Sequence, residues 1–192
     1  MSKDDGLWVF AYGSLMWRPG FAYDRSAHAI LHGAHRALCL YSHVHRGTPF
    51  RPGLVLGLDA GGICEGIAFH VPGRHARPTL NYLRRRELTN NVYRPSWRRV
   101  ALIGHPHEDV RALSYIVNRT HRQYAGDLPL EKQEWLVRRG RGRSGRNIDY
   151  VVNTVRHLRE RGIFDKRLEA LMTRFGRHRE LGGGFRSLGP ST

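Results

Sequence analysis

The sequence predicts a single α+β domain in which a closed or strongly curved sheet packs against helices. Short β-prone runs, broken by glycine, proline and polar turn residues, occupy the chain from Leu7 to about Val71. Helical periodicity occupies the last third of the 192 residues, and no internal repeat or interdomain linker interrupts the chain. We therefore expect one domain over residues 1–181, followed by a disordered glycine-rich tail over residues 182–192.

The strand predictions rest on apolar runs bounded by turn residues. Four of them lie in the first part of the chain, over residues 7–15, 35–44, 54–59 and 65–72. Two more follow after a helical segment, over residues 97–103 and 110–118. Strands followed by a block of helices favour an α+β arrangement, although the sequence does not determine the topology.

Helical periodicity is found over residues 75–89, 130–139, 147–162 and 164–176. In the first segment Leu80, Leu83 and Leu88 fall on or near one stripe, while residues 84–86, all arginine, mostly face water. We expect Asn147 to cap the start of the third helix and Gly162 to end it in the C′ position.

The charge of the chain is its most unusual compositional feature. Lys and Arg number 32 against 16 Asp and Glu, which gives a formal net charge of +16. Such a basic chain raises nucleic acid as a partner, because phosphate neutralisation drives non-specific affinity. The excess is spread from Arg18 to Arg186 instead of forming one block. A nucleic-acid-binding protein is therefore kept as the rival hypothesis and is not the expected function.

The chain has no apolar run approaching the roughly 20 residues that span a bilayer. Its N-terminus, MSKDDGLWVF, lacks the basic and apolar regions of a signal peptide. The two cysteines, Cys39 and Cys64, lie in apolar segments and do not make a disulfide framework. We expect a cytoplasmic protein that does not bind membranes.

Several tempting motifs have simpler interpretations. Residues 140–145 match G-x-G-x-x-G, but a helix instead of a strand precedes them, which favours a basic loop over a dinucleotide site. The histidine pairs at 43/45 and 105/107 lack an HExxH motif or a CxxC partner, so we expect no metal. Ser14 lacks the G-x-S-x-G context of a nucleophile, and a turn with main-chain N–H groups facing an anion is favoured.

Glu87 allows two interpretations. It follows three arginines at the end of the predicted helix, so a solvated ion pair with one of them is one interpretation. The other turns Glu87 inward beside Leu83, where loss of solvent would raise its pKa toward the range of a general base. Helical geometry permits both, and spacing alone slightly favours the ion pair.

Four segments together resemble the ChaC family of γ-glutamylcyclotransferases. They are FAYGSLMWRPGF at 10–21, HRGTPFRPGLVLGLD at 45–59, YLRRRELTNNVYRP at 82–95 and SGRNIDYVVNT at 144–154. The resemblance runs from about Leu7 to about Leu181. The YGSL turn is shared with other cyclotransferase-like families, whereas the three later segments are specific to ChaC.

The resemblance implies a small mixed β-barrel with surrounding helices and cleavage of glutathione to 5-oxoproline and cysteinylglycine without a cofactor. The α-amine of the substrate would attack its own γ-carbonyl, with Glu87 as base and then acid. Tyr93 and Tyr124 match family tyrosines. The substrate-cradling loop, with Leu15 adding a main-chain amide, falls on Val9, Phe10, Ala11, Tyr12, Gly13 and Ser14.

Some positions and alternatives stay open. Ala11 stands where many relatives have glycine, and Asn90-Asn91 stand where several have Gly-Gly. Other γ-glutamyl compounds remain alternative substrates. Arg46, Ser144 and Asn147 are either substrate contacts or loop anchors, with loop anchoring expected. The sequence does not indicate an oligomeric state.

Overall fold

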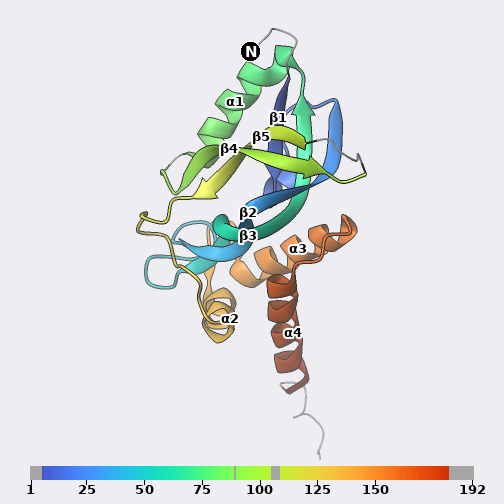
Figure 1. Ribbon diagram of the computed structural model, residues 1–192. Helices are drawn as coiled ribbons and strands as arrows, with labels where there is room; N and C mark the ends of the chain where they lie inside the picture. The colour runs from blue at the N-terminus through green and yellow to red at the C-terminus, as the bar shows by residue number, and fades with distance from the viewer. Residues whose placement is uncertain (1–5, 89, 105–108, 182–192) are drawn as a thin grey trace, which may run out of the picture.

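A computed structural model of the protein describes residues 6–88, 90–104 and 109–181. Within these residues five strands form a closed barrel in the order β1-β3-β2-β4-β5, which confirms the predicted barrel fold (Figure 1). Helix α1 runs along the outside of the barrel, whereas α2, α3 and α4 lie together at one end of the barrel, away from α1. The predicted tail at 182–192 and the histidine pair at 105/107 lie outside the described residues.

The first strand closes the barrel. β1 (Leu7–Ala11) pairs antiparallel with β3 (Gly53–Val71) and parallel with β5 (Asp109–Val117). β2 (Arg25–Ser42) lies between β3 and β4 (Tyr93–Leu102), and β4 pairs antiparallel with β5. Because β1 joins two neighbours, its C-terminal end delivers the following YGSL turn to the barrel mouth.

The prediction of four separate short strands before residue 72 is wrong in part. β2 and β3 span 18 and 19 residues and pair along most of their length. The register shifts between His32 and Ala34, where Gly33 has a φ of 80°, and Gly61 opposite it has a φ of 91°. These glycines bend a continuous hairpin as a β-bulge does, so they do not end its strands.

The helices begin and end within two residues of their predicted segments, except that α4 ends five residues later than predicted. They are α1 (Gly73–Glu87), α2 (Leu130–Arg139), α3 (Asn147–Glu160) and α4 (Lys166–Leu181). Gly162, with a φ of 70°, ends α3 as predicted, and the N–H of Ile163 donates to the carbonyl of Leu158 in a Schellman arrangement. None of the described helices is long and apolar enough to span a bilayer.

The predicted N-cap of α3 is wrong. Asn147 is the first residue of the helix, and its fully buried amide instead bonds both the N–H and the carbonyl of Leu54 in β3, at 2.6 and 2.7 Å. The side chain that would otherwise cap the helix bonds instead to a strand 93 residues away in the chain. Asn147 is thus a loop anchor that fixes α3 against the barrel.

Candidate active site

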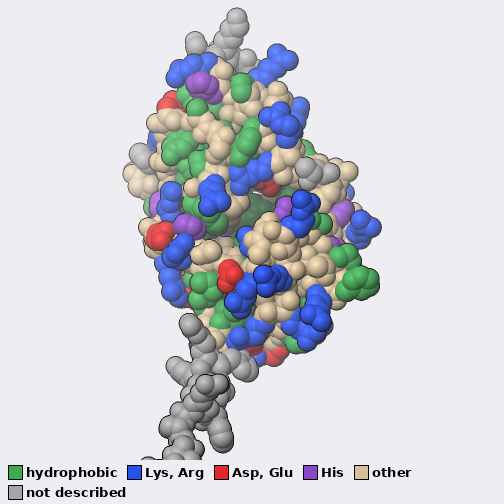
Figure 2. All heavy atoms as spheres, turned by 180° about the vertical axis from the view of Figure 1, so that it is seen from behind, with side chains coloured by type: hydrophobic (Ala, Val, Ile, Leu, Met, Phe, Trp, Pro, Cys, Tyr) green, Lys and Arg blue, Asp and Glu red, His purple; other side chains and the backbone are tan. Residues whose placement is uncertain are grey.

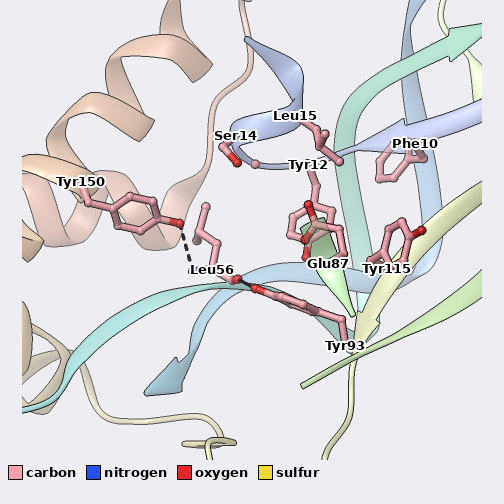
Figure 3. Close-up of a pocket in the computed structure, with 10 residues that line it drawn as sticks. Phe10, Tyr12, Ser14, Leu15, Leu56, Glu87, Tyr93, Tyr115 and Tyr150 are labelled. Atoms are coloured by element: carbon pink, nitrogen blue, oxygen red, sulfur yellow. Dashed lines mark hydrogen bonds between the residues drawn. The ribbon is translucent and has the colours of Figure 1, made fainter. Parts of the chain in front are cut away.

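A small cavity of about 70 Å³ opens at the mouth of the barrel. Its wall combines the end of β1, the short helical turn η1 (Ser14–Met16), the C-terminal end of α1, strands β3, β4 and β5, and α3 (Figure 3). The residues that line it are Phe10, Tyr12, Gly13, Ser14, Leu15, Leu56, Glu87, Tyr93, Tyr115 and Tyr150.

Glu87 is the carboxylate of this cavity. It lies four residues after Leu83, which is 0% exposed, so the same face of α1 that packs on the core also carries Glu87. The Glu87 side chain is 17% exposed. Burial raises the pKa of this carboxyl above its ordinary value, and the neighbouring Arg86 guanidinium offsets part of that rise.

Arg86 connects Glu87 to the turn after β1. Its Nε lies 3.1 Å from Glu87 Oε1, while its Nη2 donates to Ser14 Oγ at 2.8 Å. Nη1 donates to the carbonyl of Arg18 and to the Tyr82 hydroxyl at 2.9 and 2.7 Å. Both interpretations of Glu87 therefore hold in part. Its side chain lines the cavity, and it also forms an ion pair with Arg86, the residue before it in α1.

Replacing this arginine will change the titration of the carboxyl. In Arg86→Gln we expect the pKa of Glu87 to rise further, because burial continues to disfavour the carboxylate and the compensating cation is gone. The fraction of carboxylate at a given pH falls accordingly. Titration of carboxyl-labelled glutamate by NMR measures the shift. Arg85→Gln, a loss of charge at the exposed preceding residue, is the matched control, and an unchanged pKa in Arg86→Gln would contradict the prediction.

Two tyrosines from different parts of the chain are held by one residue of β3. The hydroxyl of Tyr93 donates to the carbonyl of Leu56 at 2.7 Å, and the N–H of Leu56 donates to the hydroxyl oxygen of Tyr150 at 3.2 Å (Figure 3). Burial raises the pKa of both phenols. They are neutral near pH 7, and the Tyr150 hydroxyl retains its proton for donation.

The phenols also shape the environment of Glu87. Burial raises the pKa of Tyr12 well above its ordinary value and that of Tyr115 to about 12. Tyr12 and Tyr115 are drawn on either side of Glu87 in Figure 3. A carboxyl among neutral rings is poorly solvated, and such a group accepts a proton more readily than an exposed one.

Most residues that the sequence predicted for the site do line the cavity. These are Phe10, Tyr12, Gly13, Ser14, Leu15, Glu87 and Tyr93. Val9 and Ala11 are both 0% exposed and belong to the barrel core. Their side chains serve the packing that holds β1 in place.

Tyr124 lies outside the cavity lining. Its hydroxyl donates to Asp59 Oδ2 at 2.8 Å, and the other oxygen of Asp59 accepts from Arg119 Nε at 2.7 Å. The backbone of Tyr124 forms an isolated bridge with Leu40. These contacts fasten the segment after β5 to the hairpin of β2 and β3, away from the cavity lining.

Sequence reasoning missed Leu56, Tyr115 and Tyr150 as cavity residues. The signal for Tyr150 was present, because it lies within the SGRNIDYVVNT segment, one helical turn after Asn147. Leu56 and Tyr115 carried no such signal, since an aliphatic or aromatic residue in a strand is ordinarily part of the core.

The turn Asn90-Asn91 follows Glu87 closely in the chain. Asn91 has a φ of 57°, and among the described residues it is the one non-glycine residue with a positive φ. Asparagine tolerates this left-handed conformation better than most residues, because its short side chain bonds locally. The replacement of Gly-Gly by Asn-Asn is thereby accommodated.

The other motifs do not form sites of their own. Gly140 ends α2, and the remaining residues of the G-x-G-x-x-G match form the two-stranded β6–β7 ribbon (Arg141–Gly142 with Gly145–Arg146). Among the described residues, no three His, Cys, Asp or Glu side chains gather as metal ligands. Lys and Arg side chains are scattered over the face in Figure 2 instead of forming one patch.

The arrangement is suited to proton transfer. A partly buried carboxyl with a raised pKa borders a cavity lined by neutral hydroxyl groups and by the polar main chain of residues 13–15. A carboxyl of raised pKa can accept and return a proton near neutral pH. Ser14, which contacts Arg86, has no histidine partner among the side-chain bonds of the described residues, unlike an activated serine nucleophile.

Comparisons with known proteins agree with this geometry. Residues 7–177 match the model of a family described as ChaC-like protein. The chain is 32% identical to the glutathione-specific γ-glutamylcyclotransferase of Escherichia coli strain K12, over 88% of this chain and 73% of that relative. It is 33% identical to human glutathione-specific γ-glutamylcyclotransferase 1, over 78% and 70%. A crystal structure of a yeast glutathione-specific γ-glutamylcyclotransferase superposes with a TM-score of 0.79 at 23% identity, over 88% of this chain and 95% of that one.

Proposed function

Because this chain belongs to the ChaC-like protein family, we propose that it is a γ-glutamylcyclotransferase that cleaves glutathione to 5-oxoproline and cysteinylglycine. The observation that carries the proposal is Glu87, a buried carboxyl beside a phenol-lined cavity, in the YLRRRE segment that resembles the family's catalytic motif. The names of the bacterial and human relatives support glutathione as the substrate.

The proposed reaction is an intramolecular acyl transfer. The α-amine of the γ-glutamyl group attacks the γ-carbonyl and forms the C–N bond of the five-membered lactam. The amide bond to the cysteine nitrogen then breaks. The nucleophile and the carbonyl belong to one molecule, so holding the folded conformer supplies much of the rate. The atoms of glutathione alone balance the reaction, and the mechanism needs no cofactor.

Glu87 moves the protons of this reaction in our proposal. The substrate amine is an ammonium at neutral pH and must lose a proton before it attacks. The Glu87 carboxylate accepts that proton and, as the carboxylic acid, returns it to the departing nitrogen. The second proton, which the attacking nitrogen loses as the lactam N–H forms, passes to the released amine, which leaves as an ammonium. Its raised pKa supports both roles, because the proton is held strongly enough to be taken and weakly enough to be released.

The other cavity residues bind and orient the substrate. We assign the polar main chain of Gly13, Ser14 and Leu15 to the charged end of the γ-glutamyl group or to the developing oxyanion. We assign the Tyr150 hydroxyl, whose oxygen accepts from the N–H of Leu56, to a polar atom of the substrate. Tyr93, whose proton goes to Leu56, forms part of the wall.

We also propose a cytoplasmic location. Cys39 and Cys64 are both free and buried, and burial raises the pKa of their thiols to about 12 and about 11. Unpaired, unreactive thiols are typical of reducing compartments.

The test is release of 5-oxoproline by the purified protein. We expect release from glutathione and little release from γ-glutamyl-alanine at equal concentration, measured by chromatography of the products. Cleavage of γ-glutamyl-alanine at an equal rate would move the proposal to γ-glutamyl compounds in general. Release from neither substrate by folded protein would contradict it, and a titration with nucleic acid at several salt concentrations would then test the rival function.

A further inference from the structure

A second, larger hollow of about 440 Å³ adjoins the cavity of Glu87. Ser14 and Tyr150 line both spaces, so they stand at the boundary between the two. On the far side of this boundary lie Trp17 and His157, whose rings stack with centroids 4.6 Å apart. We call this second space the basic groove.

The basic groove is lined by positive and neutral side chains only. Separate parts of the chain contribute two histidines and four arginines to it, namely Arg18, Arg46, Arg86 and Arg156. Among the described residues, its lining includes no Asp or Glu. Convergence of cations from four segments on one concave surface raises the local concentration of anions.

Two of the four arginines already have carboxylate partners. Arg86 pairs with Glu87 at 3.1 Å, and Arg156 lies 3.7 Å from Glu160. Arg46 instead donates to the main-chain carbonyls of Ser144 and Arg146 and lies over the Tyr150 ring. Within the described part of the chain, the ion pairs include neither Arg46 nor Arg18, so no carboxylate of these residues is paired with either charge.

The sizes of the two spaces show how a peptide would divide between them. A volume of about 70 Å³ is far below that of ordinary ligand pockets, whereas about 440 Å³ lies within their range of roughly 300–1,000 Å³. A γ-glutamyl group that reacts at Glu87 must therefore send the rest of the molecule past Ser14 and Tyr150. Two further residues extend about 7 Å, and because the groove adjoins the cavity, this is the reach with which their C-terminal carboxylate would enter it.

We propose that the basic groove binds the C-terminal carboxylate of the substrate, with Arg18 and Arg46 as the cations that select it. This inference rests on the proposed function and narrows its substrate class. It identifies Arg18 and Arg46 as the residues that recognise the free carboxylate at the glycine end of such a substrate. Guanidinium groups suit this task because they bind carboxylates through paired N–H donors.

The test compares glutathione with its C-terminal amide, which differs only in the charge of the glycine end. We expect the wild-type protein to prefer glutathione by about tenfold or more in kcat/KM, the size of one charge-assisted hydrogen bond. γ-Glutamylcysteine, whose carboxylate ends one residue short of the basic groove, should also be cleaved less efficiently than glutathione.

Variants of the arginines test whether the basic groove causes the preference for glutathione over its amide. In Arg18→Gln we expect a higher KM for glutathione, a nearly unchanged kcat, and loss of most of the preference over the amide, with partial rescue in Arg18→Lys. Arg77→Gln removes the same charge from a position of α1 outside both spaces and should behave as wild type. Arg46 also holds the β6–β7 ribbon through the Ser144 carbonyl, so Arg18 is the cleaner position.

The outcomes separate this inference from the proposed function. Equal kcat/KM for glutathione and its amide in the wild type overturns the groove assignment and leaves the cyclotransferase standing. Full retention of the preference in Arg18→Gln overturns the role of Arg18. Absence of cleavage of every substrate overturns the proposed function, and the groove proposal with it.

Discussion

Glu87→Gln should lower kcat for 5-oxoproline release by about 10³-fold, within the 10²–10⁴ range that general acid–base catalysis contributes. The amide keeps the shape of the side chain and its place between the phenols, but it accepts no proton from the substrate ammonium. The KM for glutathione should change much less than kcat, because the carboxyl is needed for proton transfer. Steady-state kinetics of purified protein measures both parameters.

The same substitution should not destabilise the fold. A raised pKa means that the ionised carboxyl is less favourable in the folded chain than in the unfolded chain. The folded state therefore loses stability as the pH rises from the pKa of Glu87 in the unfolded chain through its raised pKa in the folded chain. The neutral amide of the variant removes this cost at pH 7, although Arg86 loses its partner. We therefore expect a Tm equal to or above that of the wild type.

A matched control shows whether the loss of turnover is specific to position 87. Glu131→Gln makes the same replacement on α2, where the side chain is 69% exposed, and should retain wild-type kcat. Turnover by Glu87→Gln within threefold of the wild type would rule out Glu87 as the base. Loss of activity together with a much lower Tm would indicate a structural role instead.

Arg36→Met should destabilise the fold by about 3–5 kcal/mol, the loss expected when one partner of a buried ion pair is removed. Arg36 is 5% exposed and joins the barrel to the segment that leads into α4. Its Nη1 lies 3.0 Å from Asp165 Oδ2, just before α4. Nε and Nη2 donate to the carbonyls of Tyr12 and Glu65, each at 2.6 Å.

The size of this effect comes from the groups left behind. Methionine fills much of the same volume but leaves the Asp165 carboxylate, which is 13% exposed, and two carbonyls without their donor. Urea unfolding followed by fluorescence measures the loss. Arg99→Met is the control, because Arg99 is 83% exposed and its pair with Asp109 should contribute less than about 1 kcal/mol.

A second substitution tests the origin of the loss. Adding Asp165→Asn to Arg36→Met removes the unpaired charge, while the side-chain oxygen can still accept from the N–H of Leu168 at the start of α4, so part of the lost stability should be recovered. A loss below about 1 kcal/mol in Arg36→Met alone would show that the ion pair and its carbonyl contacts are not what joins the turn after β1 to α4.

The sequence predicted the type of most elements because their signals are local. The helix over 130–139 was found at its observed bounds, and Gly162 ended α3 as its conformational freedom suggests. The hairpin of β2 and β3 was predicted as separate strands, since a glycine pair in the sequence looks the same whether it bends a strand or ends one. Only pairing with the opposite strand distinguishes the two.

The same distinction between local signals and tertiary contacts applies to the candidate site. By itself the sequence predicted the helix that carries Glu87 from its apolar periodicity, and it predicted the turn at residues 12–15 and Tyr93 through short segments that resemble the family. It left open whether Glu87 pairs with an arginine or faces inward, and the tertiary structure decided that one residue does both. It misassigned Asn147 as a cap, and it grouped Tyr124 with the site although the Tyr124 hydroxyl bonds Asp59 outside the cavity lining.

Only the packing of elements distant in the chain brought the remaining groups together. Tyr150 reaches Leu56 across 94 positions of the chain, and Arg46 reaches Ser144 across 98. Periodicity and capping report the few residues around each position, whereas such contacts depend on how strands and helices pack as whole elements. For this reason the sequence predicted a base and a turn, and the three-dimensional structure assembled them into a cavity with a basic groove beside it.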